Sequence, residues 1–313
     1  MSEGFIESLE KARTIMVGTF SWIRETIKPG LSIVNFVENV ESKIEKSGGI
    51  WGFPANICIG NIAAHYTPIQ GEKVSIPDDE IVKVDIGVAV NGYVLDKALS
   101  FYFGDDDEKK AIVETANEAL SIALSKIGPG VQFMDVAHEI NDYVKSRGFR
   151  VVRNLYGHKI ERWKLHMGDV PVHPEVKSRG VFEEGAVYAI EIFVTNGDGY
   201  AETTDDVRIY SLPQFLVDVK GRLKIPVHLR VAREIFGWVW RKRKALPFSI
   251  RHLKKKFDDT AIKVALAVLS RYSLIVEYPV LRERRGTVAQ AEDTILVKKD
   301  GIEILTRPRP FPR

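Results

Sequence analysis

The sequence VDIGVAVNGYVLD, residues 84–96, has the pattern of a β-hairpin. Apolar residues alternate on both sides of Asn91-Gly92, the dipeptide that most strongly favours a two-residue hairpin turn. Asp85 and Asp96 lie on either side of this turn, so strand pairing should bring their carboxylates within roughly 5 Å if they face across the ladder. Two such carboxylates repel each other unless a cation neutralises them or one keeps its proton. We therefore expect the hairpin to supply half of a metal site.

Further metal-competent side chains occur in four other places along the chain. Glu191 and Glu292 each interrupt an otherwise apolar strand-like segment, and glutamate is rarely buried without a partner. His65 follows an apolar segment, and His158 lies eight residues before His166. Taken singly, a strand carboxylate is more often an edge residue and a histidine is usually structural. Together, four carboxylates and one imidazole suit two divalent cations about 3.5 Å apart, bridged by carboxylates and a water.

The chain also contains an internal repeat. Residues 27–48 align without a gap with residues 127–148, and both segments read as helix, Pro-Gly, helix and Gly. In each copy a later strand ends on a carboxylate, Asp85 in the first and Glu191 in the second. A duplication predicts two similar halves with helices on the outer face and a cleft between them. The alternative is a chance similarity between two helix-turn-helix segments.

The remaining elements follow from periodicity and turn signals. After Tyr210 the pattern changes to a mainly helical insertion over residues 212–275, which carries a basic run at 241–256. The predicted division is a catalytic domain at 1–211 and 276–313, with the insertion as a separate subdomain. Expected helices lie at 5–27, 32–46 and around 231–240, and expected strands lie at 51–59, 273–278, 287–297 and 301–305.

Composition narrows the class of protein. The chain has 313 residues, enough for a large buried core, and its net charge of +3 gives no general argument for nucleic-acid binding. Cys58 is the single cysteine, so an intrachain disulfide and a thiolate metal cluster are excluded. No apolar run is long enough to span a bilayer and no signal-peptide pattern is seen. We expect a cytoplasmic protein.

With these motifs the chain resembles methionine aminopeptidases of the type II (archaeal and eukaryotic) class, in peptidase family M24. The resemblance covers nearly the whole sequence and includes the insertion. It implies the α/β pita-bread fold, which is duplicated about a pseudo-twofold, with an antiparallel sheet core and outer helices. The matching motifs are Phe53-Pro54, Ala63-Ala64-His65-Tyr66-Thr67-Pro68, the hairpin at 84–96, Gly157-His158 with His166, Tyr188-Ala189-Ile190-Glu191, Tyr278-Pro279 and Gln290-Ala291-Glu292-Asp293-Thr294.

The resemblance implies a role for each matching residue. Asp85 would bind one metal, Asp96 and Glu292 would bridge two, and His158 and Glu191 would complete the second. The ions would be cobalt, manganese, iron or zinc. Glu191 would also move a proton during catalysis, while His65 and His166 would contact the substrate and act in catalysis. Phe53 and Tyr278 would line an apolar pocket for the methionine side chain. Ala291 departs from the family pattern, in which an aromatic residue is frequent at this position beside the pocket.

The implied activity is removal of the N-terminal methionine from nascent proteins and peptides, with a preference for a small second residue, through attack by a metal-bridging water. The implied partners are nascent polypeptide N-termini and, transiently, the ribosome, with no DNA or membrane partner and a monomeric state. Two alternatives stay open. One is an Xaa-Pro aminopeptidase or dipeptidase on the same fold, and the other is a metal-free homologue that binds RNA or protein. The basic run at 241–256 is most simply a solvated helical face, and the alternative is that it contacts ribosomal RNA, since the implied substrate is a nascent chain.

Overall fold

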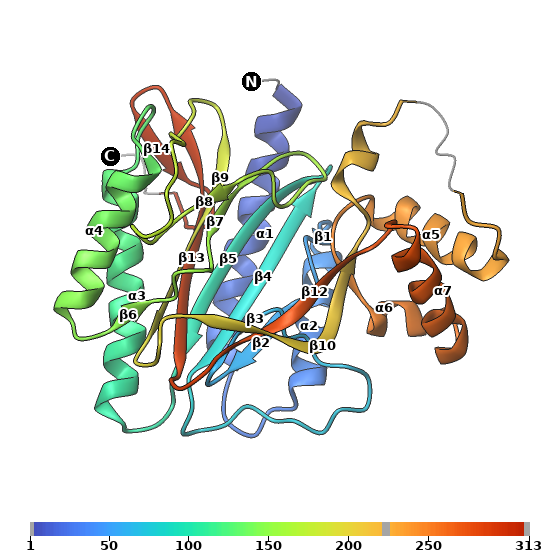
Figure 1. Cartoon of the computed structure of the whole chain (residues 1–313), viewed down its shortest axis with the longest axis horizontal. Coiled ribbons are helices and arrows are strands. Elements are labelled where there is room, and N and C mark those ends of the chain that lie inside the picture. The colour runs from blue at the N-terminus through green and yellow to red at the C-terminus, as the bar shows by residue number, and fades with distance from the viewer. Residues whose placement is uncertain (1–2, 221–225, 310–313) are drawn as a thin grey trace.

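The computed structural model describes residues 3–220 and 226–309. Within them, helices flank a set of antiparallel sheets (Figure 1). The helices are α1 (Glu3–Thr26), α2 (Ile33–Lys46), α3 (Asp107–Lys126), α4 (Phe133–Ser146), α5 (Arg230–Arg243), α6 (Ile250–Lys254) and α7 (Asp259–Arg271), with a 3₁₀ turn η1 (Gln214–Asp218). The strands are β1 (Ile50–Trp51), β2 (Asn56–Ile59), β3 (Ile62–Ala64), β4 (Val82–Val90), β5 (Tyr93–Phe101), β6 (Arg150–Val151), β7 (Gly157–Ile160), β8 (Asp169–Val170), β9 (Val187–Thr195), β10 (Ala201–Ser211), β11 (Phe248–Ser249), β12 (Val276–Glu283), β13 (Val288–Lys298) and β14 (Gly301–Ile304).

The repeat predicted from the sequence is confirmed in the backbone. Gly30 and Gly130 occupy the same left-handed conformation, with φ of 82° and 80°. Each of them donates its N–H, at 2.8 Å, to a carbonyl of a later segment, that of Ile76 in the first half and that of Phe182 in the second. Helices α1 and α2 contact the β4–β5 half, whereas α3 contacts both β9 and β13. The two halves therefore share one plan, with their helices outside the sheets (Figure 1).

The hairpin forms around Asn91-Gly92 as predicted, and both residues have positive φ. Its register differs from direct opposition of the two aspartates, because Asp85 pairs with Ala98 and Asp96 pairs with Gly87. The aspartates are thus diagonal neighbours on one face. Only glycine fits at position 87, because a Cβ there would lie 2.6 Å from the ring of Phe53.

The single strand predicted at 51–59 is wrong. The chain forms β1, breaks at Gly52-Phe53-Pro54 and resumes as β2, and both strands pair with β4. Proline has no N–H to donate to a ladder, and a Cβ at Gly52 would lie 2.7 Å from Val94. The break places Phe53 against the hairpin rather than in a sheet.

Residues 212–275 contain η1, α5, α6, α7 and the short β11, apart from 221–225, which lie outside the described residues. β11 pairs with β10, so this segment continues the sheet that also contains β12 and β3. Figure 1 shows α5, α6 and α7 gathered at one end of the molecule, away from α3 and α4.

Candidate metal centre

A cavity of about 60 Å³ lies where the two halves meet. It receives side chains from β2, β4 and β5 of the first half and from β7, β9 and β13 of the second. All nine residues predicted for the site from the sequence line this one cavity. The described lining is Phe53, Asn56, Ala64, His65, Asp85, Asp96, His158, Leu165, His166, Glu191, Ile209, Pro247, Tyr278 and Glu292.

The four carboxylates and His158 converge from strands far apart in sequence. His158 Nε2 lies 3.6 Å from Asp96 Oδ2 and 3.8 Å from Glu191 Oε1. Glu292 pairs directly with Glu191 across the β9–β13 ladder. One ligand atom from each of Asp96, His158 and Glu292 can be chosen so that all three lie within 4.8 Å of one another. This is the spacing of groups that share a cation.

The protein environment opposes the charged forms of these groups. Burial raises the pKa of Glu292, Glu191 and Asp96 well above the usual range, and the neighbouring carboxylates raise these pKa values further. Burial also raises the pKa of Asp85 to about 7 and lowers the pKa of His158 to about 4. No lysine or arginine occurs among the described lining residues. A bound cation would therefore supply the missing positive charge.

Unpartnered polar atoms show that these residues fit a divalent metal. Asp85 Oδ1, Asp96 Oδ1 and Glu292 Oε1 are buried and accept no hydrogen bond within the described structure. Buried acceptors without partners are costly unless a cation or another ligand completes them. Oxygen donors with one imidazole are the set that manganese, iron, cobalt and zinc accept.

Sequence reasoning missed two amides that hold the carboxylates. Asn56 pairs with Asp85 across the β2–β4 ladder, and its side chain counteracts part of the rise that burial causes in the pKa of that carboxyl. Gln290 acts on the pKa of Asp85 in the same direction, and its Nε2 donates to Glu292 Oε2 at 3.2 Å. Gln290 precedes Glu292 by two residues in a strand, so alternation alone placed it on the same face.

Two further histidines and a tyrosine form one wall of the cavity. His65 has a φ of 64°, and its Nδ1 lies 3.1 Å from the carbonyl oxygen of Pro279. A carbonyl can only accept, so Nδ1 carries the proton and Nε2 keeps its lone pair. The His158 and His166 ring centroids are 4.3 Å apart, and Tyr278 packs 5.9 Å from His166. Burial lowers the pKa of both His65 and His166, which keeps these rings neutral near pH 7.

Phe53 and Pro247 form the apolar side of the cavity, and one buried arginine joins them. Arg243 donates to the carbonyls of Trp51 (2.6 Å), Gly52 (3.0 Å) and Pro247 (2.9 Å). Its guanidinium lies 3.4 Å from the centroid of the Trp51 ring. The helical segment therefore contributes to the cavity wall.

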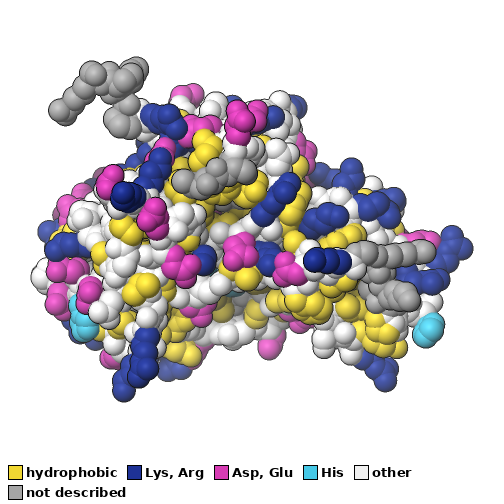
Figure 2. All heavy atoms as spheres, turned by 90° about the horizontal axis from the view of Figure 1, so that it is seen from above, with side chains coloured by type: hydrophobic (Ala, Val, Ile, Leu, Met, Phe, Trp, Pro, Cys, Tyr) yellow, Lys and Arg dark blue, Asp and Glu magenta, His cyan; other side chains and the backbone are white. Residues whose placement is uncertain are grey.

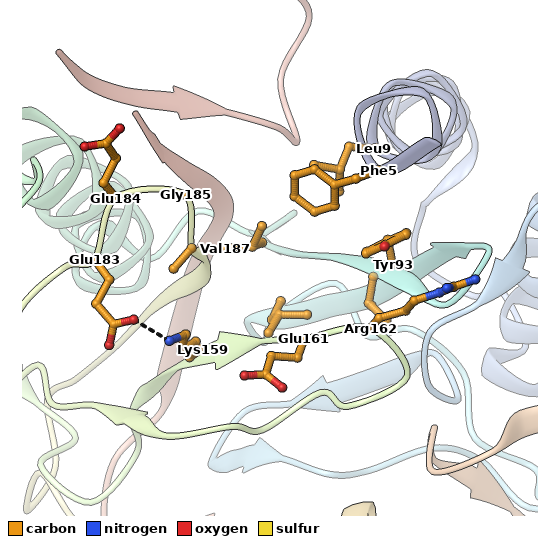
Figure 3. A pocket seen from close by; sticks show the side chains of 13 residues that line it. Phe5, Leu9, Tyr93, Lys159, Glu161, Arg162, Glu183, Glu184, Gly185 and Val187 are labelled. Atoms are coloured by element: carbon orange, nitrogen blue, oxygen red, sulfur yellow. Dashed lines mark hydrogen bonds and ion pairs between the residues drawn. The ribbon is translucent and has the colours of Figure 1, made fainter. Parts of the chain in front are cut away.

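A larger hollow of about 460 Å³ lies on the surface between the start of α1 and the β7–β9 edge (Figure 3). Phe5 and Tyr93 form its apolar side, and a Lys159–Glu183 ion pair of 2.6 Å lies at the opposite side. No histidine is among its described lining residues, so it lacks the ligand set of the smaller cavity.

Comparison with known proteins places this geometry among metal-dependent peptidases. The model of metallopeptidase family M24 matches residues 7–226. The methionine aminopeptidase of Thermococcus kodakarensis is 37% identical over 302 residues, covering 96% of this chain and 99% of that protein. The methionine aminopeptidase of Methanothermobacter thermautotrophicus is 35% identical, with 96% and 98% covered.

Solved structures show the same fold at lower identity. A thermophilic Arx1 superposes with a TM-score of 0.83 at 15% identity, covering 100% of this chain and 93% of that chain. Methionine aminopeptidase from Thermotoga maritima gives 0.69 at 20% identity, with 98% of each chain covered. Prolidase from Pyrococcus furiosus gives 0.59 at 17% identity, covering 99% of this chain and 65% of that one.

Proposed function

Because the chain belongs to metallopeptidase family M24, we propose that it is a metal-dependent aminopeptidase that releases the N-terminal methionine of proteins and peptides. The observation that carries the proposal is the convergence of four carboxylates and His158 from two half-sheets on one cavity. Relatives named methionine aminopeptidase match this chain over nearly its whole length. The pita-bread fold predicted from the sequence is the fold of the solved M24 relatives.

We assign the metal ligands as the sequence predicts them. Asp85, Asp96, His158, Glu191 and Glu292 would hold two divalent cations, with Asp96 and Glu292 between them. When bound, the cations would lower the pKa of a water molecule and polarise the scissile carbonyl. Glu191 is half-buried at the cavity surface, where its carboxylate would hold and move a proton during the reaction.

The histidines would hold the substrate amide. With Nδ1–H bonded to Pro279, His65 presents an acceptor at Nε2, which suits the N–H of the scissile bond. His166 lies between His158 and Tyr278, so it would contact the substrate beside the metal ligands. Phe53 and Tyr278 would enclose the unbranched methionine side chain. The narrow cavity agrees with a small second residue.

Metal content and peptide turnover test the proposal together. Protein freed of metal and reloaded with Mn²⁺ or Co²⁺ should bind up to two ions per chain and release methionine from a Met-Ala peptide. We expect Glu292→Ala to lose one or both ions and at least 10³-fold in kcat/KM, the scale at which a removed metal abolishes activation of water. Full metal loading and wild-type turnover in this variant would refute the assignment.

A peptide library separates the activity from its closest alternative. The same fold occurs in prolidase, so cleavage of Xaa-Pro peptides is the second candidate. Preference for Met-Ala and Met-Gly over Ala-Pro and Met-Pro would support the proposed activity. Cleavage of Xaa-Pro peptides alone would favour the alternative.

We further propose that the helical segment, residues 212–275, is a separate subdomain that contacts RNA when the enzyme meets nascent chains at the ribosome. Residues 230–271 contain twelve Lys or Arg but only three Asp or Glu, although the whole chain has a net charge of only +3. Figure 2 shows Lys and Arg side chains gathered at this end of the molecule. Such a patch binds phosphates with a strong dependence on salt.

The RNA proposal is tested by charge reversal. Lys242, Lys255 and Lys256 are exposed in the helical segment, and Lys110 and Lys126 are exposed on α3 as controls. Reversing the first set to Glu should weaken binding to ribosomal RNA at least tenfold at low salt, whereas the control reversal should change it less than threefold. An equal loss of RNA binding in both sets of variants would refute the proposed contact, because it would show that binding depends only on the total charge of the protein.

We also propose that the protein acts as a monomer in the cytoplasm. No described helix is long and apolar enough to cross a membrane. Sedimentation at micromolar concentration should give a mass near 35.3 kDa. A stable dimer would overturn this assignment.

A further inference from the structure

The two expected bridging ligands lie on neighbouring strands that belong to different sheets. Asp96 is on β5, which pairs with β4, and Glu292 is on β13, which pairs with β9 and β14. Strands β5 and β13 are in contact, but no backbone ladder joins them within the described residues. The spacing between Asp96 and Glu292 therefore depends on the side chains that connect these strands.

Two hydroxyl groups take the place of ladder hydrogen bonds. The Thr294 hydroxyl accepts from the N–H of Asp96 and donates to the carbonyl of the same residue, both at 2.7 Å. The Ser100 hydroxyl makes the corresponding pair of bonds with the backbone of Gln290, both at 2.8 Å. Thr294 extends from β13 to β5 and Ser100 extends from β5 to β13, so the two strands are bridged in both directions.

A buried ion pair lies between the two hydroxyl bridges. Lys97 directly follows Asp96 and Asp293 directly follows Glu292, and their side chains form a salt bridge on the face opposite the cavity. Asp293 is fully buried, and it also accepts from Thr306 Oγ1 at 2.6 Å and from Arg307 Nε at 2.7 Å. The C-terminal segment after β14 therefore packs against the same junction.

We infer that Ser100, Thr294 and the Lys97–Asp293 pair, together called the β5–β13 seam, position the metal centre. A shift of one strand along the other would leave two hydroxyls and two charges buried without partners, which is costly. The seam therefore permits one register and with it one spacing of Asp96 and Glu292. Fixing a single arrangement is the best-attested use of buried polar groups. The inference rests on the proposed metal centre.

The first test removes one hydroxyl and measures metal affinity instead of activity. Thr294→Val keeps the side-chain shape but cannot bridge Asp96, whereas Thr294→Ser keeps the hydroxyl. Calorimetric titration of metal-free protein with Mn²⁺ should show at least tenfold weaker binding for the valine variant. The serine variant should stay within about twofold of wild type. The visible spectrum of the Co²⁺-loaded protein should change only in the valine variant.

A second pair of variants separates positioning from stability. Lys97→Met removes the seam cation. Arg13→Met removes another buried cation, which bonds Glu303 and the carbonyls of Ile304 and Leu305 but forms no hydrogen bond or ion pair with β5 or β13 among the described residues. We expect both to lower the unfolding midpoint, and only Lys97→Met to weaken Mn²⁺ binding at least fivefold.

Wild-type affinity in folded Thr294→Val and Lys97→Met, or an equal loss in Arg13→Met, would overturn the inference. Should Thr294→Val not fold, Ser100→Ala takes its place with the same expectation. Failure of the wild-type protein itself to bind metal would instead refute the proposed metal centre.

Discussion

At the scale of single residues, His65 combines an unusual backbone conformation with a fixed proton position. Its φ of 64° is uncommon for a residue other than glycine, and such backbone conformations concentrate at functional sites. The bond to Pro279 sets which nitrogen carries the proton, so the ring can accept a hydrogen bond from substrate without changing its protonation state.

We expect His65→Ala to lower kcat by about 10²-fold or more, within the range for loss of a positioned proton-transfer or amide-binding group. Metal stoichiometry should stay unchanged because His65 is not among the assigned ligands. Steady-state kinetics on a Met-Ala peptide and metal analysis of the same sample check both statements. Loss of metal together with activity would instead place His65 among the ligands.

The raised pKa of Asp85 predicts how the stability of the metal-free protein changes with pH. A carboxyl whose folded pKa is raised to about 7 contributes stability below its unfolded pKa, near 4, and that stability is lost as pH rises through 7. Asp85→Asn cannot ionise. We expect the metal-free variant to match wild type near pH 4 and to exceed it by on the order of 4 kcal/mol at pH 8, because the pKa is raised by about three and each pKa unit corresponds to about 1.36 kcal/mol.

Denaturant unfolding of both metal-free proteins across this pH range measures the difference. Histidines whose pKa is lowered by burial change stability in the opposite direction, but they are common to both proteins and cancel in the comparison. A constant difference between the variants at all pH values would show that the Asp85 carboxyl does not titrate in this range.

At the scale of elements, helix α5 is joined to β1 of the first half by a residue in its last turn. Arg243 is buried and bonds three carbonyls on either side of the cavity wall, while its neighbour Arg241 is exposed. Nearby, Glu41 of α2 binds Arg251 at 2.8 Å and His252 at 3.0 Å, so a second buried ionic group holds α6 to the same half.

We expect Arg243→Lys to lower stability by about 2–4 kcal/mol, because an ammonium cannot bond three carbonyls and stack on Trp51 together. KM for a Met-Ala peptide should rise at least threefold, since Phe53 and Pro247 lose their common support. Arg241→Lys should change neither value. Thermal unfolding and initial rates provide the measurements. An unchanged KM in Arg243→Lys would show that Arg243 stabilises the fold but does not support the substrate pocket.

At the scale of the whole molecule, the proposed ligands divide between the two repeats. The first half supplies Asp85 and Asp96, and the second supplies His158, Glu191 and Glu292. Bound cations would therefore join two duplicated units across their junction. The helices of each half lie outside the sheets (Figure 1). The described residues that line the cavity come from strands and loops.

We expect Mn²⁺ at 100 times its dissociation constant to stabilise the protein by about 2.7 kcal/mol, which is roughly 4 °C in the unfolding midpoint for a chain of this size. Treatment with a chelator should reverse the shift. Glu292→Gln should remove the shift while leaving the metal-free midpoint unchanged or higher. An equal response to Mn²⁺ in wild type and variant would place the stabilising ion elsewhere.

Local sequence signals predicted a large part of this structure. Asn91-Gly92 favours positive φ at both positions and so forms the hairpin, and the paired Pro-Gly turns at 29–30 and 129–130 mark the repeat. Carboxylates inside apolar strands indicated a shared cation because charge is costly in such surroundings. Each of these signals depends on backbone conformation or on residues close in sequence.

Contacts between distant segments were decided only by tertiary structure. The diagonal placement of Asp85 and Asp96 follows from the ladder register, and the broken strand at 52–54 follows from packing of Phe53 on Gly87. Lys97 and Asp293 are 196 positions apart, and neither has a local signal for the other. The sequence alone determined which chemical groups are present and how each strand alternates. Packing determined which of those groups meet, because burial leaves a polar side chain only the partners that the fold brings to it.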